Sequence, residues 1–351
     1  MATLLPPSTT RAWQYSSTQG GIEKNLKLNS VPLPTPTPNQ HLVQVIATAL
    51  NPVDYKPAEV PLLHRLMLPK PATPCIDFAG CIVAPAAGSS LKRGQLVFGG
   101  AGTSPLAGGA LSEFTVAENE NTVALPNGVD PIDAATIAVG GLTAYQSIVP
   151  YVKKGDRVFI NGGSGGTGVF GIQIAKAVGC HVTTTCSTAN VELCKSLGAD
   201  EVVDYKKQGL VDALKASASS THQFDHAVDN VGANLELYWR CHEYTKPGAV
   251  YVMVGMTPSL ASLVGVFKIM LWPGFLGGGK RRLVGFFIKS ASEELEQIGM
   301  WMVDGKVKAI IDQRFTFEHA PQAFEKLKTG RAKGKIVVDV ASQTNRRGWS
   351  E

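Results

Sequence analysis

A run of glycines near the middle of the chain has the residue types and spacing of a phosphate-binding turn. Residues 160–171 carry Gly163, Gly165 and Gly168, preceded by a strand-like apolar stretch and followed by apolar residues at helical spacing. A side chain at these positions would block the tight turn and keep a pyrophosphate from the backbone N–H groups at the positive end of the helix. The pattern therefore predicts a dinucleotide site formed by Gly163, Ser164, Gly165, Gly166, Thr167 and Gly168.

The strand predicted at 181–186 indicates which dinucleotide binds. Sites for NAD usually place an aspartate or glutamate at the end of this strand, about 20 residues beyond the glycines, to bind the ribose 2′-hydroxyl. This chain has Ser187 there instead. A 2′-phosphate then has room, so the sequence favours NADPH over NADH, with Ser187, Lys195 and Tyr205 supplying hydrogen bonds and charge and Lys206 as a further candidate. The alternative is that Lys195 and Lys206 are solvated surface lysines.

The elements around the glycine run predict two kinds of structure. Residues 11–126 combine prolines, turns and short alternating runs, which is typical of a mostly β, barrel-like unit. From residue 130 onward strands alternate with helices, which predicts an α/β unit with a doubly wound parallel sheet. Its strands are expected at 157–161, 181–186, 201–203, 226–229 and 249–254, and its helices at 168–178 and 189–197.

The C-terminal third is expected to add one more strand, at 282–288, and then to return to the first unit. The pattern predicts a helix at 292–304, a strand at 312–317, a helix at 320–329 and a final strand at 334–339. The apolar segment 260–279 between these parts has several aromatic residues. It fits a lid or wall for an apolar substrate, a core helix or a dimer surface.

Composition excludes some classes of function. The 351 residues include 33 basic and 28 acidic residues, a formal net charge of +5, and the short clusters at 280–282 and 331–335 are not interleaved with aromatic residues, so no nucleic-acid binding is expected. The stretch 260–276 is interrupted by Lys268 and Pro273, which argues against a membrane span. The first residues lack the basic start and apolar core of a signal peptide, so a cytoplasmic location is expected.

The cysteines do not predict a metal site. The six cysteines include no CxxC pair and are not spaced as a disulfide framework, so we expect reduced thiols. His64, Cys75 and Cys81 are the only residues that suggest a cluster, and their spacing does not favour a metal over ordinary packing. The sequence therefore predicts no bound metal.

Several motifs in order along the chain resemble a known family. They are NPVDYK at 51–56, PCIDFAG at 74–80, GGLTA at 140–144, the glycine run, LGAD at 197–200 and GKIV at 334–337. Together they are similar to the medium-chain dehydrogenase/reductase superfamily over nearly the whole chain. Within it, the chain resembles the zinc-free quinone oxidoreductases and enoyl reductases, and in particular the fungal enoyl reductases that act in trans on polyketide synthases.

The resemblance implies a fold and a reaction. The fold is a Rossmann NADPH-binding domain at 129–289, together with a GroES-like substrate domain built from 1–128 and 290–351. Zinc-dependent relatives carry a Gly-His-Glu motif where this chain has CIDFAG at 75–80, and they carry a four-cysteine lobe that is missing here. Without zinc to polarise an alcohol, direct alcohol oxidation is disfavoured. Reduction of an activated C=C bond needs only a hydride for the β-carbon, a donor for the enolate oxygen and a proton for the α-carbon.

The resemblance also assigns roles to individual residues. It places the 51–56 segment beside the nicotinamide, so Lys56 is the first candidate for stabilising the enolate, Tyr55 for proton transfer and Asn51 for orienting substrate or ribose. The alternatives are that Asp54 only caps a short helical turn, Lys56 is solvated and Tyr55 is part of a wall. The family's further cofactor contacts fall on Thr143, Gly255, Met256, Gly334 and Lys335.

Three functions follow from these assignments. The first is NADPH-dependent reduction of an α,β-unsaturated carbonyl or thioester, such as a polyketide intermediate, with an apolar small molecule as substrate and a carrier protein of a polyketide synthase as a candidate partner. The second is quinone or small-enone reduction. The third is a non-catalytic NADPH-binding interaction protein, because a fold does not determine a function. The chain is expected to be a monomer or a homodimer, with the strand at 282–288 as the candidate dimer edge.

Overall fold

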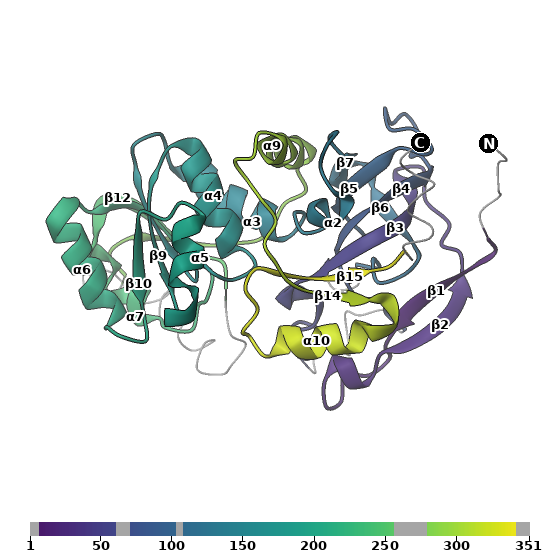
Figure 1. The fold of residues 1–351 in the computed structure, drawn as a ribbon, viewed down its shortest axis with the longest axis horizontal. Helices are drawn as coiled ribbons and strands as arrows, with labels where there is room; N and C mark the ends of the chain where they lie inside the picture. The colour runs from purple at the N-terminus through teal and green to yellow at the C-terminus, as the bar shows by residue number, and fades with distance from the viewer. Residues whose placement is uncertain (1–6, 61–70, 103–107, 256–278, 342–351) are drawn as a thin grey trace. The chain divides into compact units, whose positions relative to one another are not determined.

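The computed structural model describes residues 7–60, 71–102, 108–255 and 279–341. Contacts between these residues divide the chain into two compact units (Figure 1). The first unit comprises residues 1–141, 290–305 and 309–351, and the second comprises residues 142–289 and 306–308. The apolar segment 260–279 and Met256 lie outside the described residues, apart from Gly279.

The second unit is built on a six-stranded parallel sheet whose strand order is β10-β9-β8-β11-β12-β13. This order reverses next to β8, the first strand in the chain, as in a Rossmann fold. The strands span Arg157–Asn161 (β8), His181–Cys186 (β9), Glu201–Asp204 (β10), Phe224–Asp229 (β11), Thr245–Met253 (β12) and Arg282–Gly285 (β13). The expected doubly wound sheet is confirmed, and β13 is an edge strand that ends before the expected residue 288.

Helices pack on both faces of this parallel sheet, and its central strands β8, β9 and β11 are buried along nearly their whole length. Successive residues of β8 point to opposite faces: Val158 and Ile160 belong to one apolar cluster, and Phe159 belongs to another. The first cluster draws residues from helices α4 (Gly168–Val178) and α5 (Val191–Ser196), and the second from α6 (Leu210–Thr221) and α7 (Glu236–Trp239). Helix α3 (Gly140–Ile148) leads into the unit. The predicted helix at 168–178 is confirmed residue for residue.

The first unit contains a seven-stranded sheet with the order β14-β15-β3-β4-β5-β7, in which β6 also pairs with β3. Its strands are Gln40–Leu50 (β3), Asp77–Ala84 (β4), Leu96–Gly100 (β5), Phe114–Glu118 (β6), Thr122–Ala124 (β7), Ile311–Thr316 (β14) and Lys335–Asp339 (β15). A separate two-stranded sheet joins β1 (Thr9–Gln14) and β2 (Lys27–Pro32). Among the described residues of this unit, the α-helices are α2 (Pro131–Ala134), α9 (Ser292–Val303) and α10 (Ala320–Lys328).

The C-terminal strand returns to the first unit, as the sequence predicts. Strand β15 pairs antiparallel with β3, and this pairing sets Ile336 opposite Leu50. Both strands contribute to one apolar core that also contains Phe78 and Phe324. The pairing has a consequence for the site, because it brings the 334–335 motif next to the end of β3 and therefore next to the 51–56 segment that follows it.

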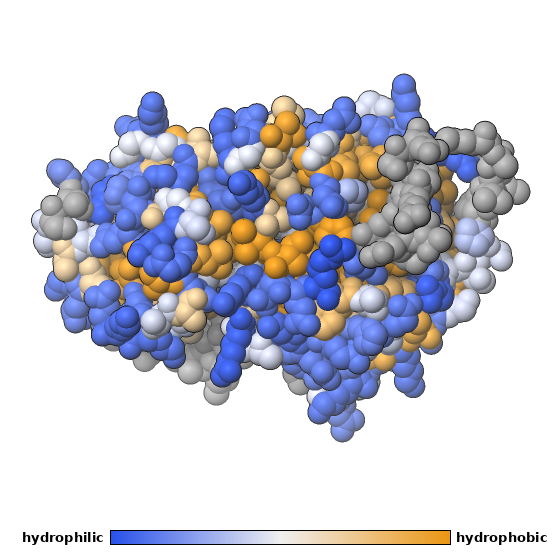
Figure 2. Space-filling view, viewed as in Figure 1, coloured by the Kyte–Doolittle hydropathy of each residue, from blue (hydrophilic) through white to orange (hydrophobic). Residues whose placement is uncertain are grey.

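Hydrophilic side chains predominate on the face of the molecule in Figure 2. The large apolar side chains that are exposed among the described residues are Tyr205, Val231, Phe287, Ile288, Met300 and Val303. Phe287 and Ile288 follow the edge strand β13. The sequence analysis names this strand as the candidate dimer edge, and that assignment stays a prediction. No helix within the described ranges is long and apolar enough to cross a membrane.

Candidate active site

The predicted dinucleotide turn joins β8 to α4, and its glycines fall into two kinds. A Cβ on Gly168 would lie 2.1 Å from the carbonyl oxygen of Gly162 and 2.7 Å from Cα of Gly163, and one on Gly163 would lie 2.1 Å from Oγ1 of Thr184. These glycines are required for the turn itself. A Cβ on Gly165 would meet only the carbonyl oxygen of Gly162 among the described atoms, at 3.5 Å. Gly165 therefore faces open space, as a surface that receives a ligand must.

A chain of buried hydrogen bonds holds this turn at the carboxyl ends of the parallel strands. The backbone N–H of Gly162 donates to Oγ1 of Thr185 at 2.9 Å, and the Thr185 hydroxyl donates to Oδ1 of Asn161 at 2.6 Å. The Asn161 amide donates to Oδ1 of Asp229 at 2.7 Å. The carboxylate of Asp229 also accepts from the hydroxyl of Tyr251 at 3.0 Å. The chain of bonds therefore connects β9, β8, β11 and β12.

This chain crosses the point where the strand order of the sheet reverses. Asn161 ends β8, Asp229 ends β11, and the two residues are paired across these neighbouring strands. Ligands of doubly wound sheets bind beyond the carboxyl ends of the strands at this point. Oδ1 of Asp229 also accepts from the backbone N–H groups of Val231 and Gly232, both at 2.9 Å, so the loop after β11 is fixed as well.

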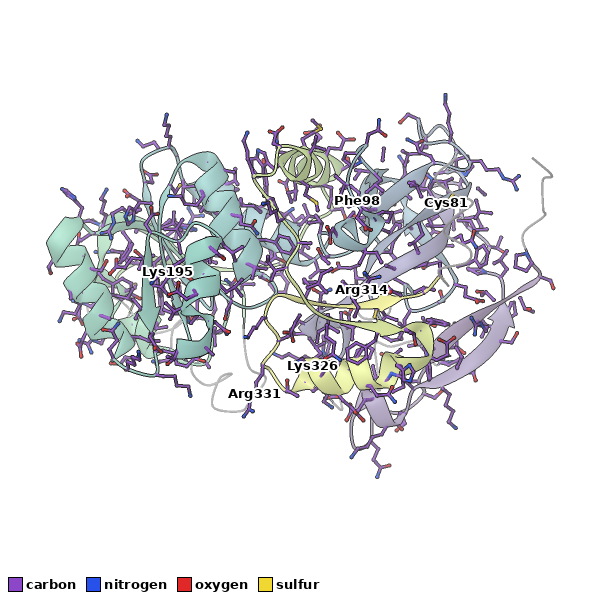
Figure 3. All side chains as sticks on the ribbon, in the orientation of Figure 1. Cys81, Phe98, Lys195, Arg314, Lys326 and Arg331 are labelled. Atoms are coloured by element: carbon purple, nitrogen blue, oxygen red, sulfur yellow. The ribbon has the colours of Figure 1, made fainter. Side chains whose placement is uncertain are left out.

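The residues predicted to read the adenosine end follow β9 and β10. Ser187 precedes a short 3-10 turn at Thr188–Asn190, and the amide of Asn190 donates to the hydroxyl of Ser164 in the glycine turn at 3.0 Å. Lys195 lies on α5 (Figure 3) and is ion-paired with Glu192 at 3.0 Å. Both side chains of this pair are largely exposed, so the ion pair contributes little to stability.

Two further residues of this region lie on the loop after β10. Tyr205 is 46% exposed, and Nζ of Lys206 lies 5.5 Å from its ring centroid. Asp204 precedes them, and a hydrogen bond with the side chain of Thr188 is the main cause that lowers the pKa of Asp204. Sequence analysis did not predict the contact of Asn190 with Ser164 or the hydrogen bond between Asp204 and Thr188.

These features fit a bound dinucleotide. The turn has a glycine whose open side leaves room for a pyrophosphate, and α4 presents its N-terminus directly after the turn. The residues that would hold the cofactor are the predicted 163–168 turn together with Ser187, Lys195 and Tyr205. Thr143 is buried on α3, and a Cβ on Gly255 would lie 2.2 Å from the carbonyl oxygen of Asn230. The predicted contacts of Thr143 and Gly255 with the cofactor stay predictions.

In the first unit, the predicted catalytic segment begins at the end of β3. Asn51 precedes a 3-10 turn at Pro52–Asp54, and the carboxylate of Asp54 accepts a hydrogen bond from the backbone N–H of Asn51 at 2.6 Å. Proline at the first position of the turn sets its φ angle. The alternative role for Asp54, capping a short helical turn, is therefore confirmed. The segment is held in a compact turn from which Tyr55 and Lys56 follow.

Asn51 belongs to a buried polar cluster that we call the Asp77 cluster, defined as Asn51, Asp54, Asp77 and Lys335. Nζ of Lys335 donates to Oδ2 of Asp77 at 2.9 Å and also to Oδ1 of Asn51. The Asn51 amide donates to Oδ2 of Asp77 at 2.9 Å. The exposed fractions of these four residues range from 0% to 4%. Asn51 and Lys335 were predicted separately as site residues, and the structure brings them into direct contact.

Burial and charge set the protonation of this cluster. Desolvation is the main cause that raises the pKa of Asp54 to about 7, with the negative charge of Asp77 as the second cause. Hydrogen bonds from backbone N–H groups and the charge of Lys335 oppose this shift only in part. Asp54 therefore carries a proton below neutral pH, and the ammonium group of Lys335 is ion-paired with Asp77 at 2.9 Å.

Tyr55 and Lys56 are both partly buried. The Tyr55 ring packs against the core of the first unit, and Nζ of Lys328 on α10 lies 5.7 Å from its centroid. Lys328 is in turn paired with Glu23 at 2.8 Å and Glu59 at 2.7 Å. Desolvation lowers the pKa of Lys56, which has no ion-pair partner among the described residues. Partial burial without a carboxylate partner is an environment in which an ammonium group can act on a substrate.

The buried acids of both units escaped sequence analysis as functional residues. Asp77 begins the otherwise apolar strand β4 within the stretch CIDFAG, and Asp229 ends β11 directly after the buried apolar residues Ala227 and Val228. A charged residue in such a stretch is rarely buried without partners. That signal was available, but the partners lie 26 and 258 residues from Asp77, so the sequence alone does not identify them.

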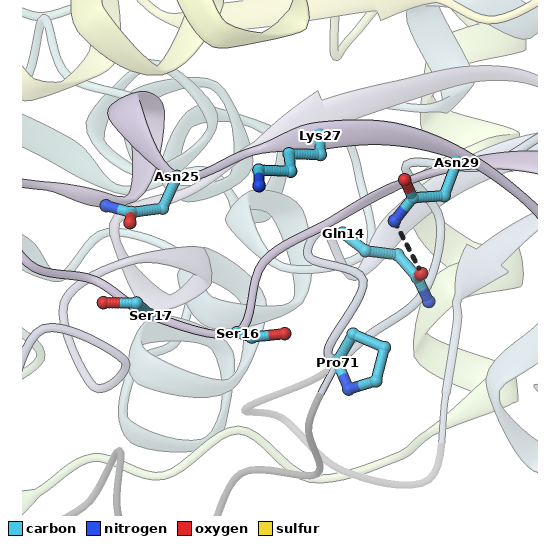
Figure 4. Close-up of a pocket in the computed structure, with 7 residues that line it drawn as sticks. All are labelled: Gln14, Ser16, Ser17, Asn25, Lys27, Asn29 and Pro71. Atoms are coloured by element: carbon cyan, nitrogen blue, oxygen red, sulfur yellow. Dashed lines mark hydrogen bonds between the residues drawn. The ribbon is translucent and has the colours of Figure 1, made fainter.

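A pocket of about 150 Å³ elsewhere in the first unit contains none of the predicted site residues (Figure 4). Gln14, Ser16, Ser17, Asn25, Lys27, Asn29 and Pro71 line it, and the Asn29 amide donates to Gln14 within it at 3.2 Å. Its lining lacks a carboxylate or thiol. Among the described residues no group of three or more His, Cys, Asp or Glu side chains is arranged to hold a metal ion.

Comparison with known proteins identifies the class of protein. The model of the alcohol dehydrogenase GroES-like domain matches residues 37–127, and the model of the zinc-binding dehydrogenases matches residues 197–338. Among solved structures, the quinone oxidoreductase of Coxiella burnetii superposes with a TM-score of 0.81 at 27% identity, covering 95% of this chain and 100% of that one. The expected combination of a Rossmann sheet and a GroES-like domain is confirmed.

Curated relatives narrow the class. The trans-enoyl reductase pgmF of Aspergillus terreus is 50% identical over 95% of this chain and 97% of its own length. The chloroplast envelope quinone oxidoreductase homolog of Arabidopsis thaliana is 34% identical over 93% of this chain and 98% of its own length. The chain belongs to the medium-chain dehydrogenase/reductase superfamily, and it is an oxidoreductase of the enoyl reductase type from a branch that uses NAD(P)H.

Proposed function

We propose that this protein is an NADPH-dependent reductase of the C=C bond of an α,β-unsaturated carbonyl or thioester, with a polyketide intermediate as its substrate. The observation that carries the proposal is the 50% identity to a trans-enoyl reductase along nearly the full length of both chains. A reductase that acts in trans meets its substrate on another protein, so a carrier protein of a polyketide synthase is the partner we propose. The substrate that we propose is a small apolar molecule, which the carrier protein presents to the enzyme.

The preference for NADPH rests on the end of β9. Ser187 stands where a carboxylate would bind a ribose 2′-hydroxyl and repel a 2′-phosphate. Tyr205 and Lys206 are nearby in sequence on the loop after β10, and the exposed side chain of Lys195 lies on α5. A phosphate gains charge-assisted hydrogen bonds from such groups. These residues support NADPH over NADH.

The residues of the first unit account for the other requirements of the reaction. When bound, the reduced nicotinamide supplies a hydride for the β-carbon. Lys56 then stabilises the negative charge that develops on the carbonyl oxygen, since its ammonium group is partly desolvated and free of a carboxylate among the described residues. Tyr55 is the candidate for delivering the α-carbon proton. Asn51, Thr143, Gly334 and Lys335 orient the reactants, and the chain needs no metal ion for these steps.

A second candidate function is reduction of quinones or small enones. The quinone oxidoreductase relatives favour it, because they share the fold at 27% to 34% identity. A third candidate, a protein that binds NADPH without catalysis, has no supporting relative among those compared above.

The deciding experiment measures anaerobic consumption of NADPH and of NADH against enoyl thioesters, simple enones and quinones, with products identified by mass. We expect NADPH-selective addition of two hydrogens to an enoyl thioester. Activity confined to quinones would support the second function. Tight NADPH binding with no turnover on any acceptor, tested also with a carrier-bound enoyl thioester, would contradict both enzymatic functions.

A further inference from the structure

We propose that Asp77 is a positioning residue of this active site, because its single carboxylate group holds three segments that carry predicted site residues. Its Oδ2 accepts from the Asn51 amide and from Nζ of Lys335, both at 2.9 Å. Its Oδ1 accepts from the backbone N–H of Val139 at 2.6 Å. The inference deepens the proposed function and rests on it for the role of these segments.

The three segments are distant in sequence, and the Asp77 carboxylate contacts all three of them. Asn51 opens the segment that carries Tyr55 and Lys56, and Lys335 belongs to the predicted cofactor motif. Val139 immediately precedes α3, the helix that carries Thr143. One side chain thus contacts the first residue of the 51–56 segment, the residue before α3 and the ammonium group of Lys335. None of these contacts was assigned by the sequence motifs.

The chemistry of the cluster requires an ionised carboxylate at this position. Three donors converge on Asp77, and a carboxylate is an acceptor at both oxygens. Asp77 is completely buried, and Lys335 is 2% exposed. Removing one partner of such a pair leaves a buried charge without compensation, whereas removing both charges together is far less costly. This difference separates a positioning role from a purely structural one.

The tests use three variants. Asp77→Asn keeps the shape of the side chain and removes its charge. Asp77→Asn combined with Lys335→Met removes both charges, so that a loss of stability in the single variant is recovered. Thr48→Val is the matched control: the Thr48 hydroxyl is buried and donates at 2.6 Å to the backbone carbonyl of Asp77 without touching the carboxylate.

Two measurements are made on each folded variant. Hydrogen exchange of the 51–60 peptide reports how firmly the segment is held, independently of any activity, and kcat with an enoyl thioester reports the consequence for catalysis. We expect Asp77→Asn and the double variant to exchange at least about tenfold faster in this peptide. We also expect kcat to fall by about 10- to 100-fold in both, since misplacement of reacting groups by about 1 Å has effects of this size. Thr48→Val should leave both quantities at wild-type values.

The outcomes are distinguishable. Wild-type exchange and wild-type kcat in the folded double variant would overturn the positioning role, because the carboxylate would then be dispensable once its charge is balanced. If the wild-type protein reduces no C=C acceptor, the proposed function is overturned. Faster hydrogen exchange in the Asp77 variants would in that case still support the structural role of Asp77. Equal losses in Thr48→Val and Asp77→Asn would also overturn the proposal, since packing rather than the carboxylate would then be responsible.

Discussion

The hydroxyl of Tyr251 on β12 donates a hydrogen bond to Asp229 on β11 at 3.0 Å, and both side chains are buried. This contact is the far end of the bonded chain that reaches the first residue of the glycine turn through Asn161 and Thr185. A continuous series of hydrogen bonds thus connects Tyr251 to the glycine turn, whereas the buried hydroxyl of Tyr244 in the same unit bonds to the backbone of Leu237.

Tyr251→Phe should weaken nucleotide binding without unfolding the protein. Loss of a hydrogen bond to a charged acceptor costs about 1.5–3 kcal/mol, and we expect about 1 kcal/mol of it to appear as an approximately fivefold rise in the Kd for NADPH. The matched control is Tyr244→Phe, because the Tyr244 hydroxyl is also buried but donates to the backbone carbonyl of Leu237 at 2.5 Å. Titration calorimetry on both variants gives the comparison. An equal change of Kd in both would contradict a specific connection.

Gly168→Ala should lower the stability of the protein, whereas Gly165→Ala should lower its affinity for NADPH. At Gly168 a methyl group would lie 2.1 Å from a backbone oxygen, so we expect a loss of stability of at least about 1–3 kcal/mol by thermal unfolding. At Gly165 the nearest described atom is 3.5 Å away, so the unfolding temperature should stay at the wild-type value. NADPH affinity of Gly165→Ala should nevertheless fall at least about tenfold, because the methyl group fills the open side of the turn. Unchanged affinity would exclude Gly165 from the cofactor surface.

The fold of both units follows closely from sequence patterns. Alternation of apolar strands and amphipathic helices predicted β8, α4 and β9 to the residue, since these elements are continuous and bounded by glycines or polar turns. The boundaries of β12 and β13 were less accurate. Strand β12 begins at Thr245, four residues before the expected start, because Thr245 pairs with Phe224 of β11. Lys246, Pro247 and Gly248 are poor strand formers and fall at a register shift of this ladder.

The sequence predicts the glycine turn of the candidate site but does not predict the side chains that hold this turn. Glycine spacing identifies the turn because the requirement is local. The side chains that hold the turn are Thr185, Asn161, Asp229 and Tyr251, which come from four strands whose proximity depends on sheet order. The same applies to Asp77, whose partner Lys335 lies 258 residues away. Predicted roles of Lys56, Tyr55 and Thr143 stay predictions.

Lys56→Ala should lower kcat for C=C reduction by about 100-fold or more and leave the Kd for NADPH unchanged. Burial lowers the pKa of Lys56, so the ammonium form is lost at a lower pH than in an ordinary lysine. Activity that depends on this charge is complete below the lowered pKa and disappears as pH rises through it. Lys56→Arg keeps its charge over the same range and should abolish this alkaline loss. A wild-type kcat in Lys56→Ala would remove Lys56 from the mechanism.

Asp54→Asn should change how stability depends on pH. The carboxyl group has an ordinary pKa of 3.8, and burial raises it to about 7 in the folded protein. The folded state therefore binds a proton that the unfolded state releases, and the wild-type protein loses stability as pH rises from about 4 to about 7, by up to about 1.4 kcal/mol per pH unit. The amide cannot ionise but still accepts from the Asn51 N–H. Denaturant unfolding at several pH values should show a flatter profile for the variant, and parallel profiles would contradict the assignment.

His226→Gln tests the opposite dependence in the second unit. His226 is completely buried, its Nε2 lies 2.7 Å from the backbone carbonyl oxygen of Ser147, and its ring stacks on Tyr151 at 5.0 Å. Desolvation is the main cause that lowers its pKa from 6.5 to about 4. The unfolded chain therefore takes up a proton that the folded one excludes, and stability falls as pH decreases from about 6.5 to about 4. Glutamine retains an amide that can donate to Ser147 and does not titrate.

Because Asp54 and His226 act in the same pH range with opposite sign, the wild-type profile alone does not separate them. The difference in unfolding free energy between His226→Gln and the wild type should change in favour of the variant as pH falls through this range, by up to about 1.4 kcal/mol per pH unit. A pH-independent difference for His226→Gln would show that the imidazole is protonated in the folded state.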